Sequence, residues 1–137
     1  MKDLENNSKN VEGIAPIINE LRYKGNLTGV LYVKNNGELI DESIEKSIDS
    51  KAFASMCASV MESATEIRDT LGEQQINKII AELDNESIII IKIDKTTFLV
   101  CILNVQSNNT LILEDLDNYI QKIKDYNNII NSSSNQD

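Results

Sequence analysis

The sequence predicts a mixed α/β (α+β) domain, a three-layer sandwich in which helices cover both faces of an antiparallel sheet. Two runs, 88–93 (IIIIKI) and 98–103 (FLVCIL), are apolar at consecutive positions and flank a short polar break at Asp94 and Lys95. Strands joined so closely are antiparallel, and an antiparallel strand with one face in water alternates apolar and polar residues. Both strands are therefore expected to be covered on both faces. The other patterns follow the order helix, two strands, helix, three strands, helix.

The first helix and the first hairpin carry clear start and turn signals. A helix is expected at 14–24, where Pro16 falls in the first turn and its missing N–H is not needed. From just before this helix, apolar residues recur at helical spacing: Val11, Ile14, Ile17, Ile18 and Leu21. The turn sequence Asn-Asn-Gly at 35–37 favours a tight hairpin because both residue types tolerate positive φ, so strands are expected at 27–33 and 38–42.

The middle helix, expected at 51–71 and stopped by Gly72, carries two adjoining stripes. One stripe has the spacing of a helix that packs on a sheet: Phe53, Cys57, Val60, Ala64, Ile67 and Leu71. With a rotation of about 100° per residue, a second stripe of small or apolar residues lies beside it: Ala54, Ala58, Met61 and Thr65. Because this arc is wider than one sheet contact requires, the helix is expected to have two neighbours.

The second half of the chain is expected to supply three strands and a last helix. The strands are expected at 76–83, 88–93 and 98–103. The helix is expected to begin near Asn109, because acidic residues follow early and lysines late, as the helix dipole favours.

The length of 137 residues suits one domain. Both ends of the chain are rich in Asn and poor in apolar residues, so they cannot bury enough surface to offset the entropy of ordering. We therefore expect a domain at 11–127 between disordered tails at 1–10 and 128–137.

Several segments carry recognisable patterns of packing and turns. They are LTGVLYVKNNGELI (27–40), INKIIAEL (76–83), the two strands that follow, and LILEDLDNYIQKI (111–123). Together they resemble the roadblock family, small domains named for a dynein light chain. The resemblance implies a five-stranded antiparallel sheet of roadblock/profilin-like type, with the middle helix on one face and the terminal helices on the other. None of these segments is a catalytic signature, so function is argued separately.

The resemblance also implies a dimer, homomeric or heteromeric, and two surfaces are expected to form it. A lone domain would leave the second stripe of the middle helix in water. The family places the strand at 76–83 at the sheet edge, where it can pair with its copy, with Lys78 and Glu82 facing each other. The expected interface residues are Ala54, Ala58, Met61, Thr65, Ile76, Lys78, Ile79, Ile80 and Glu82.

Composition excludes some partner classes. The net charge of −9 argues against nucleic acid and anionic membranes, which recruit clustered Lys and Arg. No apolar stretch has the length of about 18 residues that a membrane helix needs, and the first ten residues lack the apolar core of a signal peptide. A cytoplasmic protein is therefore expected, without membrane insertion.

Catalytic chemistry is not expected, because the chain has no His and its five glycines form no phosphate-binding loop. Cys57 and Cys101 lie in apolar patterns, where free cysteine behaves as a small hydrophobe. The acidic clusters lack the spacing of a calcium loop and are interpreted as solvated surface. We expect no cofactor and no metal.

An acidic stripe follows the far side of the middle helix. Glu62, Glu66 and Asp69 form it, and like charges four residues apart cost about 0.2–0.5 kcal/mol per pair, which a basic partner would relieve. The alternative is a solvated helix face in an acidic protein. Arg22 and Arg68 are the only arginines, so an arginine finger would have to be one of them.

Three functions compete. The resemblance implies a homodimer that regulates a small Ras-like GTPase, as some prokaryotic members of the family do, by repositioning the catalytic groups of the GTPase. The alternative is a structural adaptor that dimerises and holds other proteins together without effect on GTP hydrolysis. A small-ligand sensor is disfavoured because the central strands bring almost no polar residues into the core.

Overall fold

The computed structural model of the chain describes residues 13–45 and 47–136, without the side chains at 113 and 131–136. The tail expected at 1–10 lies outside the described residues. The elements are α2 (Ile14–Gly25), β1 (Gly29–Lys34), β2 (Leu39–Ile44), α3 (Ser50–Asp69), β3 (Lys78–Glu82), β4 (Glu86–Lys92), β5 (Thr97–Asn104) and α4 (Asn109–Gln136).

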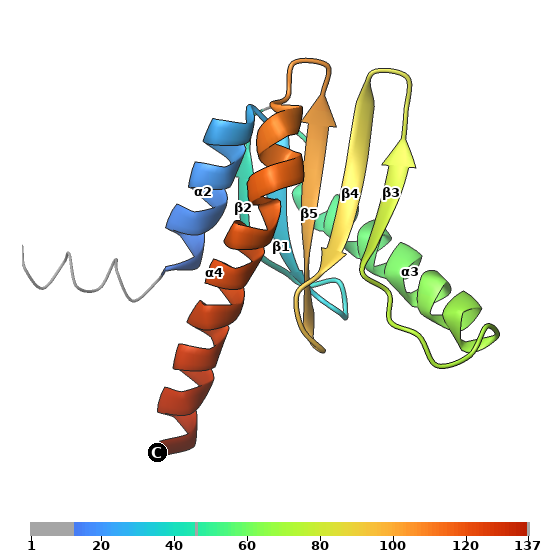
Figure 1. Cartoon of the computed structure of the whole chain (residues 1–137), viewed down its shortest axis with the longest axis vertical. Helices are drawn as coiled ribbons and strands as arrows, with labels where there is room; N and C mark the ends of the chain where they lie inside the picture. The colour runs from blue at the N-terminus through green and yellow to red at the C-terminus, as the bar shows by residue number, and fades with distance from the viewer. Residues whose placement is uncertain (1–12, 46, 137) are drawn as a thin grey trace, which may run out of the picture.

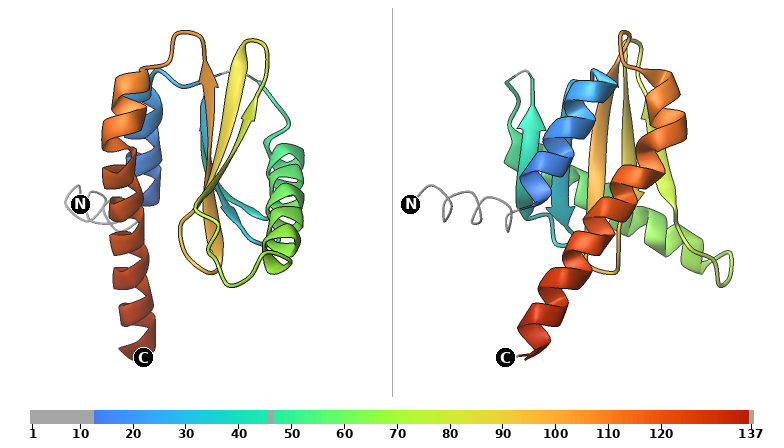
Figure 2. Two further views of the ribbon diagram at one scale, coloured as in Figure 1. Left: turned by 45° about the vertical axis from the view of Figure 1, so that its right-hand side comes forward. Right: turned by 60° about the vertical axis from the view of Figure 1, so that its left-hand side comes forward.

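The strands form one antiparallel sheet in the order β2-β1-β5-β4-β3. The sheet lies between two helical layers, with α3 on one face and α2 and α4 on the other (Figures 1 and 2). The predicted fold class and element order are confirmed.

The consecutive apolar runs divide between the two faces. Ile89 and Leu99 point toward α2 and α4, whereas their neighbours Ile90 and Val100 point toward α3. Each face therefore has its own apolar core, which is why β4 and β5 do not alternate with polar residues.

Turn chemistry fixes the first hairpin as expected. Gly37 has φ +95°, and the side chain of Asn36 accepts a hydrogen bond from the Glu38 amide at 2.9 Å. A Cβ atom at Gly37 would come within 3.3 Å of Ser55 Cα, so the turn packs closely on α3.

The boundaries of the elements lie within two residues of the prediction, except at the end of the last helix. The ladder of β3 begins at Lys78, two residues after the expected start at Ile76. The last helix continues to Gln136, through the segment expected to be a disordered tail from 128. No Gly or Pro interrupts the sequence there, so the backbone lacks a stop signal.

Candidate interaction site

β3 is an edge strand whose side chains face solvent. Among the described residues it pairs with β4 alone, in a regular register that places Ile80 opposite Ile89. Ile79 is half-buried, whereas the exposed fraction of the Ile80 side chain is 52%. An edge of this kind offers unpaired N–H and C=O groups to another strand.

Hydrogen bonds at both ends of the β3–β4 pair show which backbone groups face the free edge. The Leu83 amide donates to the Glu86 carbonyl at 2.7 Å. At the other end, the Lys92 amide donates to the Asn77 carbonyl at 3.3 Å. Because antiparallel pairs alternate, the odd-numbered residues turn toward β4. The groups that point to the free edge belong to Lys78, Ile80 and Glu82.

The second half of α3 extends beyond β3 (Figure 2). Apolar side chains on one flank of this helix are exposed. The exposed fraction of Ile67 is 63%, and that of Leu71, just after the helix, is 69%. A shallow groove of about 500 Å³ separates this flank from the Ile76–Ile79 segment. We call the flank and the strand edge together the open face; its exposed apolar residues are Met56, Val60, Ile67, Leu71, Ile80 and Leu83.

The two stripes of α3 are exchanged relative to the prediction. Ala54, Ala58 and Met61 are buried against the sheet of their own chain, and Thr65 is half-buried with its hydroxyl donating to the Met61 carbonyl at 2.9 Å. They do not form a wet stripe, so the argument that placed them in a dimer interface was wrong. Of the stripe expected on the sheet, Cys57 is buried and Phe53 and Ala64 are half-buried, whereas Val60, Ile67 and Leu71 are exposed.

The physical reason is the close approach of the helix to the sheet. Small side chains at Ala54 and Ala58 let α3 come near β1, β2 and the hairpin turn at Gly37. Larger side chains, such as Val60 and Ile67, are turned sideways. Sequence spacing gave both stripes but could not tell which one faced the sheet.

The acidic stripe lies on the other flank of α3. Glu62 and Glu66 are exposed and border a depression of about 440 Å³ together with Asn36 and Lys92. Asp69 is also exposed, but it accepts a hydrogen bond from Arg68 Nη2 at 2.9 Å. The structure therefore brings Glu62 and Glu66 together beside the hairpin, whereas Asp69 is engaged by its neighbour.

Neither arginine extends freely into solvent. Arg22 is half-buried, and its Nε donates to Ser43 Oγ at 2.7 Å, which ties α2 to β2. Arg68 is also half-buried and is held by Asp69. An arginine finger would have to break one of these contacts first.

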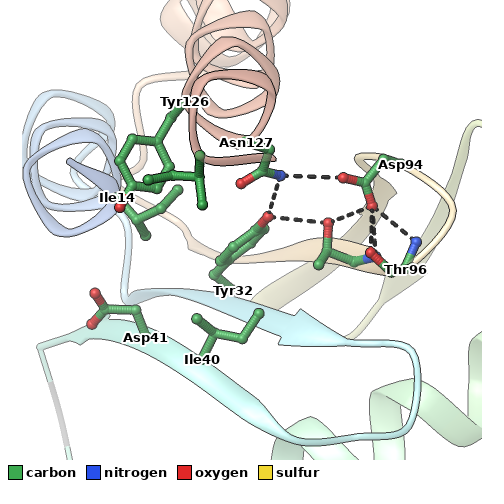
Figure 3. Close-up of a pocket in the computed structure, with 10 residues that line it drawn as sticks. Ile14, Tyr32, Ile40, Asp41, Asp94, Thr96, Tyr126 and Asn127 are labelled. Atoms are coloured by element: carbon green, nitrogen blue, oxygen red, sulfur yellow. Dashed lines mark hydrogen bonds between the residues drawn. The ribbon is translucent and has the colours of Figure 1, made fainter. Parts of the chain in front are cut away.

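A polar network that the sequence did not predict borders a pocket of about 370 Å³ near the start of α2 (Figure 3). Asn127 Nδ2 donates to Tyr32 Oη at 2.7 Å and to Asp94 Oδ2 at 3.2 Å. Tyr32 in turn donates to Thr97 Oγ1 at 3.1 Å. The network joins α4 to β1 and to the β4–β5 turn.

Asp94 is the centre of this network. Its Oδ1 accepts from the backbone amides of Thr96 and Thr97, both at 2.9 Å. Burial acts to raise the pKa of the Asp94 carboxyl, but the hydrogen bonds from Thr96 and Thr97 together outweigh it and lower that pKa. The polar side chains of the network that could hold a ligand are already hydrogen-bonded within the protein. The network therefore holds α4 against the sheet. The turn sequence Asp-Lys-Thr-Thr at 94–97 could have predicted the local hydrogen bonds of Asp94 with Thr96 and Thr97.

The two cysteines occupy the core, as predicted. Burial raises the pKa of the Cys57 thiol to about 11 and that of Cys101 to about 12. Both thiols are therefore protonated near neutral pH, which disfavours nucleophilic chemistry. The described residues include no group of three or more acidic or cysteine side chains placed to hold a metal ion. Within 13–45 and 47–136, no helix is both long enough and apolar enough to cross a bilayer.

Comparison with known proteins identifies the fold. The sequence profile described as Roadblock/LC7 domain matches residues 14–103, more than half of the chain. Among curated protein sequences, none matches.

Three solved structures illustrate the likeness. MglB from Myxococcus xanthus is 19% identical, with a TM-score of 0.76 over 85% of this chain and 94% of that one. A structure of MglB in a tetrameric arrangement is 11% identical, with a TM-score of 0.77 over 85% and 88% of the two chains. Profilin IA from Acanthamoeba castellanii is 18% identical, with a TM-score of 0.52 over 80% and 91%. At these identities the likeness concerns the fold alone.

Proposed function

This chain belongs to the Roadblock/LC7 domain family, and we propose that it is a homodimeric, non-enzymatic binding protein that regulates a small Ras-like GTPase. The observation that carries the proposal is the open face, since a strand edge beside an exposed apolar flank is a surface that a second copy can cover. The GTPase is the partner that the resemblance to prokaryotic members implies.

In the proposed dimer, β3 pairs with its copy in an antiparallel register centred on Ile80. Lys78 then lies opposite Glu82 of the other protomer, and the outward backbone groups of both strands form hydrogen-bonded pairs. The side chains of Lys78, Ile80 and Glu82 all project to the α4 face. Lys78 and Ile80 lie opposite Ile91 and Ile89 of β4, which belong to the core on that face, and alternation along β3 places Glu82 on the same side. The sheets of the two protomers become one continuous sheet.

On the other face, the apolar flanks of the two α3 helices pack side by side. Full burial of an aliphatic side chain contributes about 1.5–3 kcal/mol, so this contact adds substantially to the strand pairing. The proposed helix contribution to the interface is therefore Met56, Val60, Ile67 and Leu71, in place of Ala54, Ala58, Met61 and Thr65. Ile76 and Ile79 support the strand from the α3 side.

The GTPase is proposed to dock on the acidic flank of α3. At about 100° per residue, Glu62 and Glu66 lie far around the helix from Val60 and Ile67, so the dimer leaves them exposed. Two copies present carboxylates to a basic patch, with binding that weakens as salt rises. Asp69 contributes less because Arg68 already neutralises it.

The proposed mechanism is repositioning of the catalytic groups of the GTPase. The chain has no His, and both arginines are held within the protein. Insertion of charge from this chain is therefore not part of the proposal.

The proposal is tested by single-turnover hydrolysis of GTP by a small Ras-like GTPase from the same organism, sought among neighbouring genes by its P-loop motif. We expect hydrolysis to change when the chain is added, to survive Arg22→Ala and Arg68→Ala, and to be lost with the double variant Glu62→Lys/Glu66→Lys, which should remain dimeric. Loss of activity with either arginine variant would overturn the mechanism, and undiminished binding by the double variant would overturn the docking site.

The second candidate is an adaptor without effect on GTP hydrolysis. The tetrameric arrangement of one similar structure favours a role in assembly. This candidate predicts that the GTPase is retained in a pull-down while its single-turnover rate stays unchanged.

A further inference from the structure

A groove of about 630 Å³ lies on the α4 face, between α4 and the end of the sheet where β3 begins. Its floor is apolar: Ile91, Ile93 and Leu116 are buried, and Ile120 is half-buried. This groove is on the opposite side of the sheet from the acidic flank, so the GTPase proposal does not use it.

Four lysines line the groove. Lys92 points to the α3 side of the sheet, and the other three lie around the floor. Lys78 leaves β3 on the α4 side, Lys95 lies in the β4–β5 turn, and Lys124 follows Ile120 on α4. Within the part of the chain that the structure describes, none of these ammonium groups has an ion pair or a hydrogen bond. In contrast, Lys24 and Lys34 each lie within 4 Å of a glutamate.

Two acidic residues also line the groove, but one of them is already engaged. Asp94 accepts hydrogen bonds from Thr96, Thr97 and Asn127. Asp117 is exposed and remains. The rim is therefore positive in a chain whose net charge is −9.

We propose that this groove binds an acidic peptide segment of a partner protein, whose apolar side chains cover the floor while its carboxylates meet Lys95 and Lys124. Charge complementarity selects such a segment, and the apolar floor supplies the contact area. A nucleic acid fits less well, because the groove offers neither an arginine nor an aromatic ring for stacking, and the rest of the surface repels a polyanion.

The experiment uses the full chain and a labelled synthetic peptide with Leu at helical spacing and Glu elsewhere. The same peptide with Lys in place of Glu tests charge, and an oligo-dT strand tests the nucleic-acid alternative. Binding is measured by fluorescence anisotropy at low and high salt. Amide chemical shifts of the labelled protein locate the site.

The test variant is the double reversal Lys95→Glu/Lys124→Glu. Lys78 is kept because it is proposed to face Glu82 across the dimer seam, so a failure of the dimer cannot be mistaken for a failure of the groove. The matched control is Lys34→Glu/Lys51→Glu, which makes the same charge change on the hairpin and at the start of α3.

We expect binding of the Glu peptide alone, shifts centred on Lys95 and Lys124, and a loss of about ten-fold in affinity for the test variant, against little change for the control. Four results would overturn the proposal: no binding of the Glu peptide, binding of oligo-dT instead, equal losses in both variants, or a change in oligomeric state that makes the groove a contact between copies of this chain.

Discussion

The two edge strands of the sheet present their backbones to solvent in different ways. The ladder between β1 and β2 has a register shift between Tyr32 and Val33 of β1, where Ile40 is the extra residue on β2. β2 also carries two adjacent acids, Asp41 and Glu42. The Glu42 amide, which points away from β1, is bound by Asp41 Oδ1 at 2.8 Å. Bulges, charges and side-chain caps are the means by which proteins block edge pairing.

β3 carries exposed charges too, Lys78 and Glu82, but they are opposite in sign and would lie opposite each other in an antiparallel pair of copies. Neither a bulge nor a side-chain cap is found among its described residues. Its register is regular, Ile80 stands on the edge, and the apolar flank of α3 extends beside it. One edge of this domain is therefore closed to other strands, whereas the opposite edge is open. We predict association through β3 and not through β2.

The largest effect is expected from Ile67→Glu. A charge in the proposed helix contact would be buried without a partner, which costs several kcal/mol, so the dimer should dissociate by about 100-fold or more. Ile40→Glu makes the same change on the β2 side and should leave the dimer intact. Sedimentation velocity at micromolar concentration measures both. A monomeric wild type would contradict the open-face argument at once.

A proline pair separates the dimer from the fold. Ile80→Pro removes a donor that faces the free edge, and we expect dimer affinity to fall by about ten-fold or more while the thermal unfolding of the domain changes little. Ile79→Pro removes a donor that faces β4, so it should lower the unfolding temperature itself. If the two variants behave alike, the assignment of inward and outward groups is wrong.

The hydrogen-bond network around Asp94, which joins α4 to β1 and to the β4–β5 turn, should affect stability and not association. Asp94→Asn places an amide donor opposite Asn127 and should cost about 1–3 kcal/mol of unfolding free energy at pH 7, measured by urea denaturation. The dimer dissociation constant should stay the same once the domain is folded.

The pH dependence of that loss follows from the lowered pKa of Asp94. A carboxyl whose pKa is lower in the folded state stabilises the fold fully above its unfolded value of 3.8, and the contribution disappears as the pH falls through the folded value. The difference between wild type and Asp94→Asn should therefore shrink below pH 3.8. A difference that stays constant down to pH 2 would contradict a role for the ionised carboxylate, pH 2 being about two units below the ordinary value.

The smallest effect concerns the exposed charges at the seam. Lys78→Glu and Glu82→Lys should each weaken the dimer by a few-fold, since exposed ion pairs contribute about 0.2–1 kcal/mol. The double variant restores opposite charges and should recover the original affinity. If the double variant does not recover the dimer affinity, the two β3 strands pair in another register.

Sequence patterns predicted most of the fold because the central strands are apolar at nearly every position. Consecutive apolar residues in β4 and β5 required two covering layers, and the turn at Gly37 required a hairpin. The site was harder, since periodicity places residues on a helix face without saying which face meets the sheet. The stripe that contains Ala54 and the stripe that contains Val60 both have helical spacing. Only the close approach of α3 to the hairpin shows which stripe faces the sheet.

Other features depended on contacts between distant segments. Asn127 was expected to be the last residue of the domain, directly before the tail, and its partners Tyr32 and Asp94 are far from it in sequence. No local pattern announces such a contact. The pairing of Asp94 with Thr96 and Thr97, in contrast, is local and could be read from the turn.

The pairing of β1 with β5 at the centre of the sheet has a consequence for how the chain folds. It joins residues near position 30 to residues near position 100, whereas the other ladders pair strands that follow each other in the chain. Closing so long a loop loses entropy before any contact is gained, so we expect the two hairpin units to form early and this ladder to form last. Until then β5 is a second open edge, which makes the partly folded chain prone to aggregate. Refolding at increasing protein concentration would report this as a falling yield of native protein.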